Sequence, residues 1–456
     1  MRRIAANKPL TKSSPRRRGS SKFWNNLVSR LRGNDKTVLN QSFTRSPKQR
    51  LAQRGQVLLF ILAILILGVG AVFYTFSGSS DSTVERDKIT AAALAQAKAA
   101  LIGWSAGRGA NTGTARPGEL PCPDTDGNGF EEGTCAAGRI GRIPWKTLGI
   151  PEPKDDSGET LWYAISGPFR KTVGTAINSD TKGTLIVYQG STALTLTNEA
   201  IAVIFSPGLA LGTQSRDTTS APCATTGTTI QRDRCAANYL ETETLSGVNN
   251  ATTGGPFISA QKIPGSFNDS ILAITTTDLM PLVEQRVARD ILSVLQSYKA
   301  NSGCNCYPWA DVSTGASDPG LNRGRIPGYD PLNLLGPYAL PVEWGSGSAP
   351  TLPQWFIDNE WRRIVYYSVA RIATDGGGGS CTSCTNNTLT VGSTTGIEVV
   401  LIMPGAAGAG RPVTYPWTDW RPYVDDNENN NYWTQNDTFV VPVSTAATRD
   451  RIYTIP

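Results

Sequence analysis

The sequence predicts an α+β protein in which an N-terminal transmembrane helix continues into an amphipathic helix, followed by two tandem domains. Each domain is predicted to be a helix packed on an antiparallel β-sheet. Three observations support this fold: a long uncharged stretch, two segments of helical periodicity, and a set of landmarks that occurs twice in the same order. The predicted parts are a basic leader over 1–55, the transmembrane helix over 56–80, and domains over 81–275 and 276–456.

The transmembrane helix is predicted from the stretch Val57 to Phe76, which contains 20 residues and no charge. At about 1.5 Å per residue this helix would span roughly 30 Å, the thickness of a bilayer core. A helix at the surface of a soluble protein would have a polar face, and this stretch has none. No A-x-A cleavage pattern directly follows it, so it does not resemble a secretory signal that is removed.

The charges predict which side of the membrane each part occupies. Residues 1–55 carry 15 lysines and arginines against one acid, Asp35, whereas the whole chain carries 43 against 37. The basic end is therefore expected to stay in the cytoplasm, as a disordered leader, and the rest to be exported. An arm that binds nucleic acid is a weaker alternative for this segment, and we predict no nucleic-acid partner.

The cysteines favour the same localisation: the inner membrane of a bacterium, single-pass, with the C-terminal domains in the periplasm. All eight follow the apolar stretch, and an even number suits disulfide bonds in an oxidising compartment. They are Cys122, Cys135, Cys223, Cys235, Cys304, Cys306, Cys381 and Cys384.

The first amphipathic helix is predicted over 84–104, where alanine is frequent. Leu94, Ala97, Leu101 and Trp104 recur at helical spacing and form one apolar stripe.

The second amphipathic helix is predicted to begin at Thr277, which can cap it, with Pro281 in its first turn. Its stripe includes Val283, Val287 and Ile291, and its charged residues exclude a second membrane span.

The remainder of the first domain is predicted to contain short strands. Apolar runs such as GTLIVYQG and EAIAVIFSPG are rich in β-branched or aromatic residues and are bounded by Gly, Pro or Asp. The stretch Thr213 to Gly254 has little periodicity and is predicted to be mostly loop.

An internal repeat is the most informative feature of the chain. Six landmarks of the first domain return in the second in the same order, which predicts two copies of one fold behind one anchor. The matched pairs are Leu120–Asp124 with Tyr307–Asp311, Gly141–Pro144 with Gly324–Pro327, Trp162–Ile165 with Tyr366–Val369, Ile204–Gly208 with Leu401–Gly405, Tyr239–Glu241 with Tyr423–Asp425, and Asn268–Ser270 with Asn436–Thr438.

Arg54-Gly55-Gln56, placed directly before the apolar stretch, resembles the prepilin signal of type IV pilins and type II secretion pseudopilins. The resemblance implies cleavage by prepilin peptidase between Gly55 and Gln56. That family usually has Glu at the fifth mature position, where this chain has Phe60, and in this respect the chain is similar to tip pseudopilins and minor pilins. Residues 55–456 also resemble large prepilin-like bacterial proteins with an LPCPD…GRIPW…LWYA pattern.

The resemblance implies a structural minor pilin or pseudopilin-like subunit of a type IV pilus or a type II secretion pseudopilus. Its partners would be the inner membrane, other pilin or pseudopilin subunits and prepilin peptidase. The alternative is a membrane-anchored periplasmic or surface binding and adhesion protein that does not enter a filament. We predict that the chain is not an enzyme, because it has no histidine and no paired catalytic constellation.

The segment from Asp124 to Gly129, DTDGNG, matches the D-x-[DN]-x-[DN]-G start of a calcium loop, in which oxygen ligands alternate along the chain. Cys135 stands where an EF-hand has its final Glu, so the loop is not an EF-hand. A solvated loop of Asx-turns is the competing interpretation. The candidate calcium ligands are Asp124, Asp126, Asn128, Glu131 and Glu132.

Two local disulfides are predicted, Cys122–Cys135 and Cys223–Cys235, each closing a loop of about a dozen residues. For the other four cysteines we favour disulfides between the pair 304/306 and the pair 381/384. A zinc site made of these four is the less favoured alternative.

Overall fold

The computed structural model describes residues 82–108, 115–171, 175–301, 305–310, 322–327, 352–370, 388–406, 424, 429, 437–441 and 449–456. They belong to one compact unit, Ser80–Pro456. The predicted leader, the prepilin cleavage site at Gly55 and Gln56, and the apolar stretch lie outside the described residues. Among the helices that are described, none is long and apolar enough to span a bilayer.

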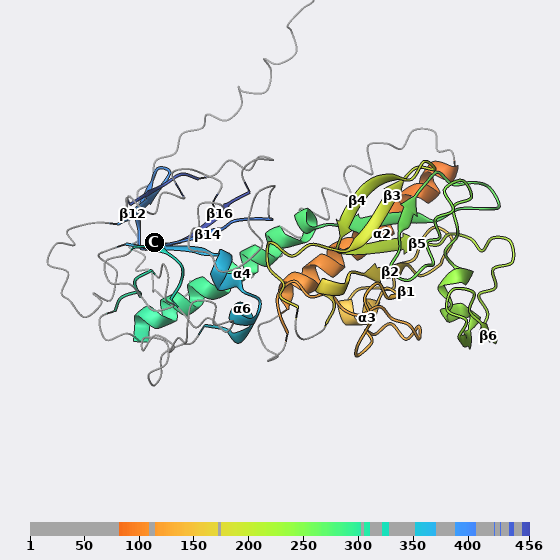
Figure 1. The fold of residues 1–456 in the computed structure, drawn as a ribbon, viewed down its shortest axis with the longest axis horizontal. Helices are drawn as coiled ribbons and strands as arrows, with labels where there is room; N and C mark the ends of the chain where they lie inside the picture. The colour runs from red at the N-terminus through yellow and green to blue at the C-terminus, as the bar shows by residue number, and fades with distance from the viewer. Residues whose placement is uncertain are drawn as a thin grey trace, which may run out of the picture. The chain divides into compact units, whose positions relative to one another are not determined.

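The first amphipathic helix is present as α2, Ser82–Gly107. Its predicted stripe faces the core: Leu94, Ala97 and Leu101 are buried, and Trp104 is half-buried. The helix lies against β5 (Ala202–Ser206) and β9 (Ser270–Ile274) (Figure 1). The α-helical spacing of apolar residues therefore predicted both the element and its buried face.

The second helix, α4, spans Thr276–Asn301 and buries its predicted stripe, but its start differs from the prediction. The Asp278 carboxylate accepts hydrogen bonds of 2.8 Å from both the backbone N–H and the Oγ1–H of Thr275. This contact places the N-cap at Thr275 instead of Thr277. Pro281 is consequently inside the helix and not in its first turn.

Two four-stranded antiparallel sheets have the same strand order. The first has the order β1-β2-β5-β9, and the second has the order β10-β11-β14-β16, with α4 against β14 and β16 (Figure 1). Their strands are β1 Ile140–Arg142, β2 Trp162–Ile165, β5 Ala202–Ser206, β9 Ser270–Ile274, β10 Arg323–Gly324, β11 Tyr366–Val369, β14 Val399–Met403 and β16 Arg451–Ile455.

Each copy also contains a three-stranded sheet in which one pairing is parallel, β3 with β8 and β12 with β15. The predicted antiparallel sheet is therefore present in each copy, and the second, mixed sheet was not predicted. The strands are β3 Leu185–Gln189, β4 Leu194–Ala200, β8 Phe257–Ser259, β12 Leu389–Val391, β13 Thr394–Ile397 and β15 Thr438–Phe439. The hairpin β6 Ser220–Pro222 and β7 Thr229–Gln231 lies in the segment predicted to be loop.

Short helices complete the described part of the chain. They are α3 Trp145–Leu148, η1 Gly167–Phe169, η2 Arg232–Arg234, η3 Ala236–Asn238, α6 Gln354–Asp358 and α7 Trp361–Ile364.

Matched landmarks occupy matched positions in the two large sheets. Gly141 lies opposite Tyr163 across β1 and β2, and Gly324 lies opposite Tyr367 across β10 and β11. On the next strand pair, Tyr163 faces Ile204 and Tyr367 faces Leu401. The two copies thus share strand order, direction and register.

One sequence match is wrong. Ser270 begins β9, the edge strand of the first large sheet, whereas Thr438 begins β15, the counterpart of β8. The register of the outer strands makes Arg451 the counterpart of Ser270. Asp450 therefore corresponds to Asp269. The two N-D-[ST] segments are similar in sequence, but they lead into strands that are not counterparts in the two copies.

A single apolar core contains residues of both copies, including Leu101, Tyr163 and Ile291 together with Tyr367 and Leu401. A second cluster belongs to the first copy and includes Trp162, Phe205 and Phe257.

Polar contacts also join the two copies. The side-chain oxygen of Asn359 accepts the backbone N–H of Ile177 at 2.8 Å, and its backbone carbonyl accepts the Asn178 side-chain amide at 2.9 Å. The buried Glu284 of α4 accepts the Ser179 hydroxyl at 2.5 Å and forms an ion pair with Arg451. Apolar packing and buried hydrogen bonds therefore both connect the first copy to the second.

Candidate metal-binding loop

The predicted calcium loop is fixed at its base by the sheet and by a disulfide. The backbone of Asp124 pairs with that of Arg142 on β1, through N–H to carbonyl bonds of 2.9 and 2.6 Å. The disulfide Cys122–Cys135 closes the loop, with 5.7 Å between the two Cα atoms. Both ends of the acidic segment are consequently held in place.

Asp124 organises the turn through its carboxylate, which is almost inaccessible to solvent. One oxygen accepts the Gly127 N–H and the other accepts the Gly129 N–H, each at 2.7 Å. Gly127 has a φ of +78°, and a Cβ there would collide with the guanidinium of Arg142. The left-handed backbone therefore favours glycine at this position, and a Cβ there would also make the end of the Arg142 side chain shift.

Three of the predicted ligands gather at one place. Asp124, Asp126 and Glu132 each offer a carboxylate oxygen, and these atoms lie within 4.8 Å of one another. Glu132 is drawn into the group by Thr125, whose backbone N–H and hydroxyl donate to Glu132 Oε1 at 3.0 and 2.5 Å. Clustered carboxylates of this kind could hold a hard divalent cation.

The electrostatics of the loop are those of a crowded anionic site. Burial raises the pKa of Asp124, backbone hydrogen bonds from Gly129 and Gly127 oppose that rise, and the neighbouring Asp126 adds to it. Placing negative charge at Asp124 is thus unfavourable in the absence of a cation. A divalent ion would offset both the burial and the repulsion.

The other two predicted ligands are placed differently. Asn128 lies beside the group, where its amide nitrogen donates to Asp126 at 2.9 Å and its side-chain oxygen accepts the Phe130 N–H at 2.7 Å. Glu131 lies outside the group, because its side chain pairs with Lys171 at 3.2 Å. The structure therefore brings together Asp124, Asp126 and Glu132, with Asn128 adjacent.

Lys146 also contacts the loop, which the motif did not indicate. Its ammonium donates to the Asn128 carbonyl at 2.6 Å and lies over the rings of Phe130 and Trp145, at 5.1 and 5.0 Å. Phe130 is exposed on the loop. Lys146 follows the G-R-I-P landmark. It lies close to the loop because it is part of the short helix α3, and the sequence of the loop gives no sign of this contact.

Both predicted local disulfides are formed, Cys122–Cys135 and Cys223–Cys235. Cys306 is also disulfide-bonded, and the remaining three cysteines lie outside the described residues. None of the cysteines that the structure describes is free.

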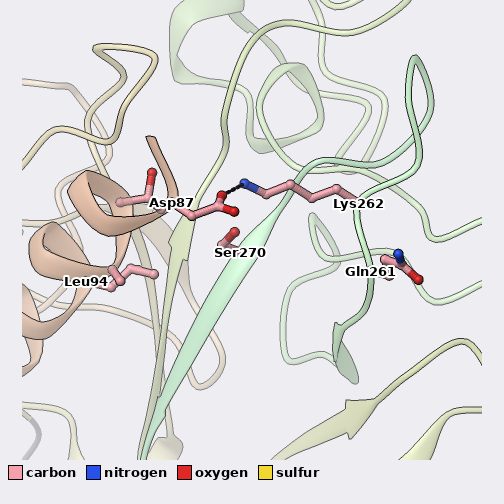
Figure 2. A pocket seen from close by; sticks show the side chains of 7 residues that line it. Asp87, Leu94, Gln261, Lys262 and Ser270 are labelled. Atoms are coloured by element: carbon pink, nitrogen blue, oxygen red, sulfur yellow. Dashed lines mark hydrogen bonds and ion pairs between the residues drawn. The ribbon is translucent and has the colours of Figure 1, made fainter. Parts of the chain in front are cut away.

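A shallow cleft of about 430 Å³ lies between α2 and the start of β9 (Figure 2). Asp87 and Lys262 face each other across it and form an ion pair of 2.9 Å. These two charges satisfy each other, and the cleft shows no feature that selects a ligand. The lining residues are Asp87, Thr90, Ala91, Leu94, Gln261, Lys262 and Ser270.

Comparison with protein-family models, with curated proteins and with solved structures finds no match for this chain. The chemistry of its own residues and the arrangement of its two copies are therefore the basis for assigning a role.

Proposed function

We propose that the chain is a structural minor pilin or pseudopilin-like subunit of a type IV pilus or type II secretion pseudopilus, inserted through its N-terminal apolar helix. One observation carries the proposal: Arg54-Gly55-Gln56 and the apolar stretch 57–76 are followed, after residues 77–81, by a helix whose buried stripe lies on an antiparallel sheet. That succession is what the resemblance to pilins implies.

The contacts of α2 support a mechanical role for this helix. Asp156 binds Arg86 through an ion pair of 2.6 Å and accepts the Thr90 hydroxyl at 2.9 Å. The ion pair between Asp87 and Lys262 adds a second connection at the same end of the helix. These contacts connect the N-terminal end of α2 to the rest of the first copy, so a force applied to that end would be transmitted to the domain.

The second copy supports a low-copy position rather than the shaft. Its helix α4 repeats the amphipathic element without an apolar extension, so one anchor carries two copies. The two copies share a core, which makes them one bulky body for helical stacking. Phe60 in place of the usual Glu favours the same position, through the resemblance to tip subunits.

We further propose that the loop from Asp124 to Glu132 binds calcium. The carboxylates of Asp124, Asp126 and Glu132 supply oxygen ligands, and the adjacent Asn128 holds the loop beside them by donating to Asp126 and accepting the Phe130 N–H. The closing disulfide limits the freedom of the loop before the ion binds, which favours affinity.

Incorporation into filaments tests the proposed role. The full chain is detected in sheared surface filaments or cross-linked pseudopili of cells that carry the assembly machinery. We expect it in the filament fraction, and we expect Gly55→Ala to remain in the membrane fraction. Retention of the wild-type chain in the membrane, with no filament signal, would favour the anchored binding protein instead.

A further inference from the structure

A pair of buried carboxyl groups lies in the first copy, away from the calcium loop. Glu241 follows the Tyr239-Leu240 landmark, and Asp269 directly precedes β9. Their exposed fractions are 7% and 1%, respectively. The backbone N–H of Glu241 donates to Asp269 Oδ2 at 3.0 Å, so the two residues are in direct contact.

The two oxygens of Asp269 have different surroundings. Oδ2 accepts two hydrogen bonds, from the Glu241 N–H and from the Asn250 side-chain amide at 2.9 Å. Oδ1 is inaccessible to solvent and receives no donor among the described residues. Asn250 is itself fixed by Ile258 of β8, whose N–H and carbonyl it binds at 2.8 and 3.1 Å, so its amide nitrogen is oriented toward Asp269.

Glu241 is surrounded by donors. Its Oε1 accepts the Gln214 amide at 2.8 Å, and its Oε2 accepts the Asn268 N–H at 3.0 Å. The charged group that faces it is Arg216, which forms an ion pair of 3.0 Å with Glu159 and stacks on Tyr239. A negative charge is therefore better accommodated on Glu241 than on Asp269.

The electrostatic directions agree with this geometry. Burial, followed by the charge of Glu241, raises the pKa of Asp269 well above its usual range. Burial also raises the pKa of Glu241, but the Asn268 N–H, Gln214, Asp269 and Arg216 oppose that rise. Two negative charges in contact at a buried site are unfavourable, so the pair retains a proton.

Asp155, also buried in the first copy, shows the opposite arrangement. One of its oxygens accepts the N–H groups of Ser157 and Glu159, at 2.9 and 3.0 Å. The other accepts the Ser206 hydroxyl and the Gly208 N–H, both at 2.9 Å. Four donors surround the Asp155 carboxylate, whereas Asp269 has an oxygen that receives none among the described residues.

We propose that Asp269 is held as a neutral carboxylic acid that shares its Oδ1 proton with Glu241, and that loss of this proton as pH rises loosens the first copy. The pair connects the segment after Tyr239 to the edge strand β9. The folded state binds this proton more tightly than the unfolded chain does. The stabilisation is therefore complete at low pH and is lost as pH rises toward the pKa of the folded pair.

Asp269→Asn tests the proposal, because asparagine reproduces the neutral acid. Its oxygen can accept the bonds from Glu241 and Asn250, and its amide nitrogen can donate toward the Glu241 carboxylate. The Tm of the full chain in detergent is measured from about pH 5 to about pH 9. We expect the Tm of the variant minus that of wild type to increase with pH, by at least about 2 °C across the range.

Asp155→Asn is the matched control, and it should lower the Tm at every pH because it places an amide nitrogen against donors. A Tm difference for Asp269→Asn that is flat or falls with pH would overturn the proposal. Infrared spectroscopy of the wild type gives a second test that needs no stable variant. A protonated carboxyl band is expected at neutral pH, to be lost as the pair titrates, and its absence at neutral pH would also overturn the proposal.

Discussion

Tyr163 and Tyr367 make the same hydrogen bond in the two copies. The phenolic O–H of Tyr163 donates to the Pro121 carbonyl at 2.8 Å, and that of Tyr367 donates to the Pro308 carbonyl at 2.8 Å. Both rings are completely buried on the second strand of a four-stranded sheet. The bond joins that strand to the segment after the long helix, so it is a shared structural element of the repeat.

Removal of either phenolic hydroxyl should destabilise the protein to a similar extent. Tyr163→Phe and Tyr367→Phe each leave a buried carbonyl without its donor, which costs about 1–2 kcal/mol. Chemical denaturation of the full chain in detergent measures the loss. Tyr188→Phe on β3 is the control, since its ring is half-exposed and its hydroxyl donates no hydrogen bond among the described residues. Equal losses in all three variants would contradict the role of the repeated bond.

Loss of Glu284 should weaken the connection between the two copies. Glu284→Ala removes the ion pair with Arg451 and the acceptor of Ser179, and we expect a cost of about 3 kcal/mol in the free energy of unfolding. This cost is at the low end of the range for breaking a buried ion pair, because the Arg451 side chain is partly exposed. Arg286→Ala on the same helix breaks a more exposed pair with Asp290 and should cost about 0.5 kcal/mol. A small effect of Glu284→Ala would show that the buried bridge is dispensable.

Calcium at about 5 mM should raise the Tm of the chain, because it binds the folded loop and not the unfolded chain. Asp124→Asn should abolish that rise by removing a ligand at the centre of the carboxylate group. Glu131→Gln should retain it, since Glu131 pairs with Lys171 outside the group. An unchanged Tm of the wild type in calcium would refute binding at this loop.

The two local disulfides should separate stability from calcium affinity. Replacing both cysteines by serine in either pair opens a loop of similar length and costs about 3 kcal/mol in the chain-entropy estimate. Only the Cys122/Cys135 variant should also weaken calcium binding in a titration, because that pair closes the loop proposed to bind calcium. Equal calcium affinities in the two variants would show that the disulfide does not preorganise the site.

The sequence predicted features that depend on local periodicity or on spacing. The stripes of α2 and α4 identified both helices and their buried faces, and the spacing of Cys122 and Cys135 identified their disulfide. The sequence match also identified Tyr367 as the counterpart of Tyr163, because both tyrosines lie on the second strand of their sheet, each opposite a glycine of the G-R-I-P landmark.

Features that depend on distant contacts were not predictable. The parallel pairing of β3 with β8 brings together segments that are far apart in the chain and carry no mutual pattern. The equivalence of Asp269 and Asp450 follows from strand register, whereas their flanking letters differ. In the loop from Asp124 to Glu132, the calcium-binding motif could not distinguish Glu131 from Glu132 as a ligand. The folded loop places the Glu132 side chain beside Thr125, from which it accepts a hydrogen bond, and the Glu131 side chain beside Lys171, with which it forms an ion pair.

The mature N-terminus tests the proposed role most directly. The full chain is extracted from membranes of cells with and without prepilin peptidase, and its first residues are sequenced. The proposal predicts an N-terminus at Gln56 only where the peptidase is present, and an uncleaved leader with Gly55→Ala. An N-terminus elsewhere, or the same N-terminus in both cell types, would contradict the assignment of this chain as a pilin-like subunit.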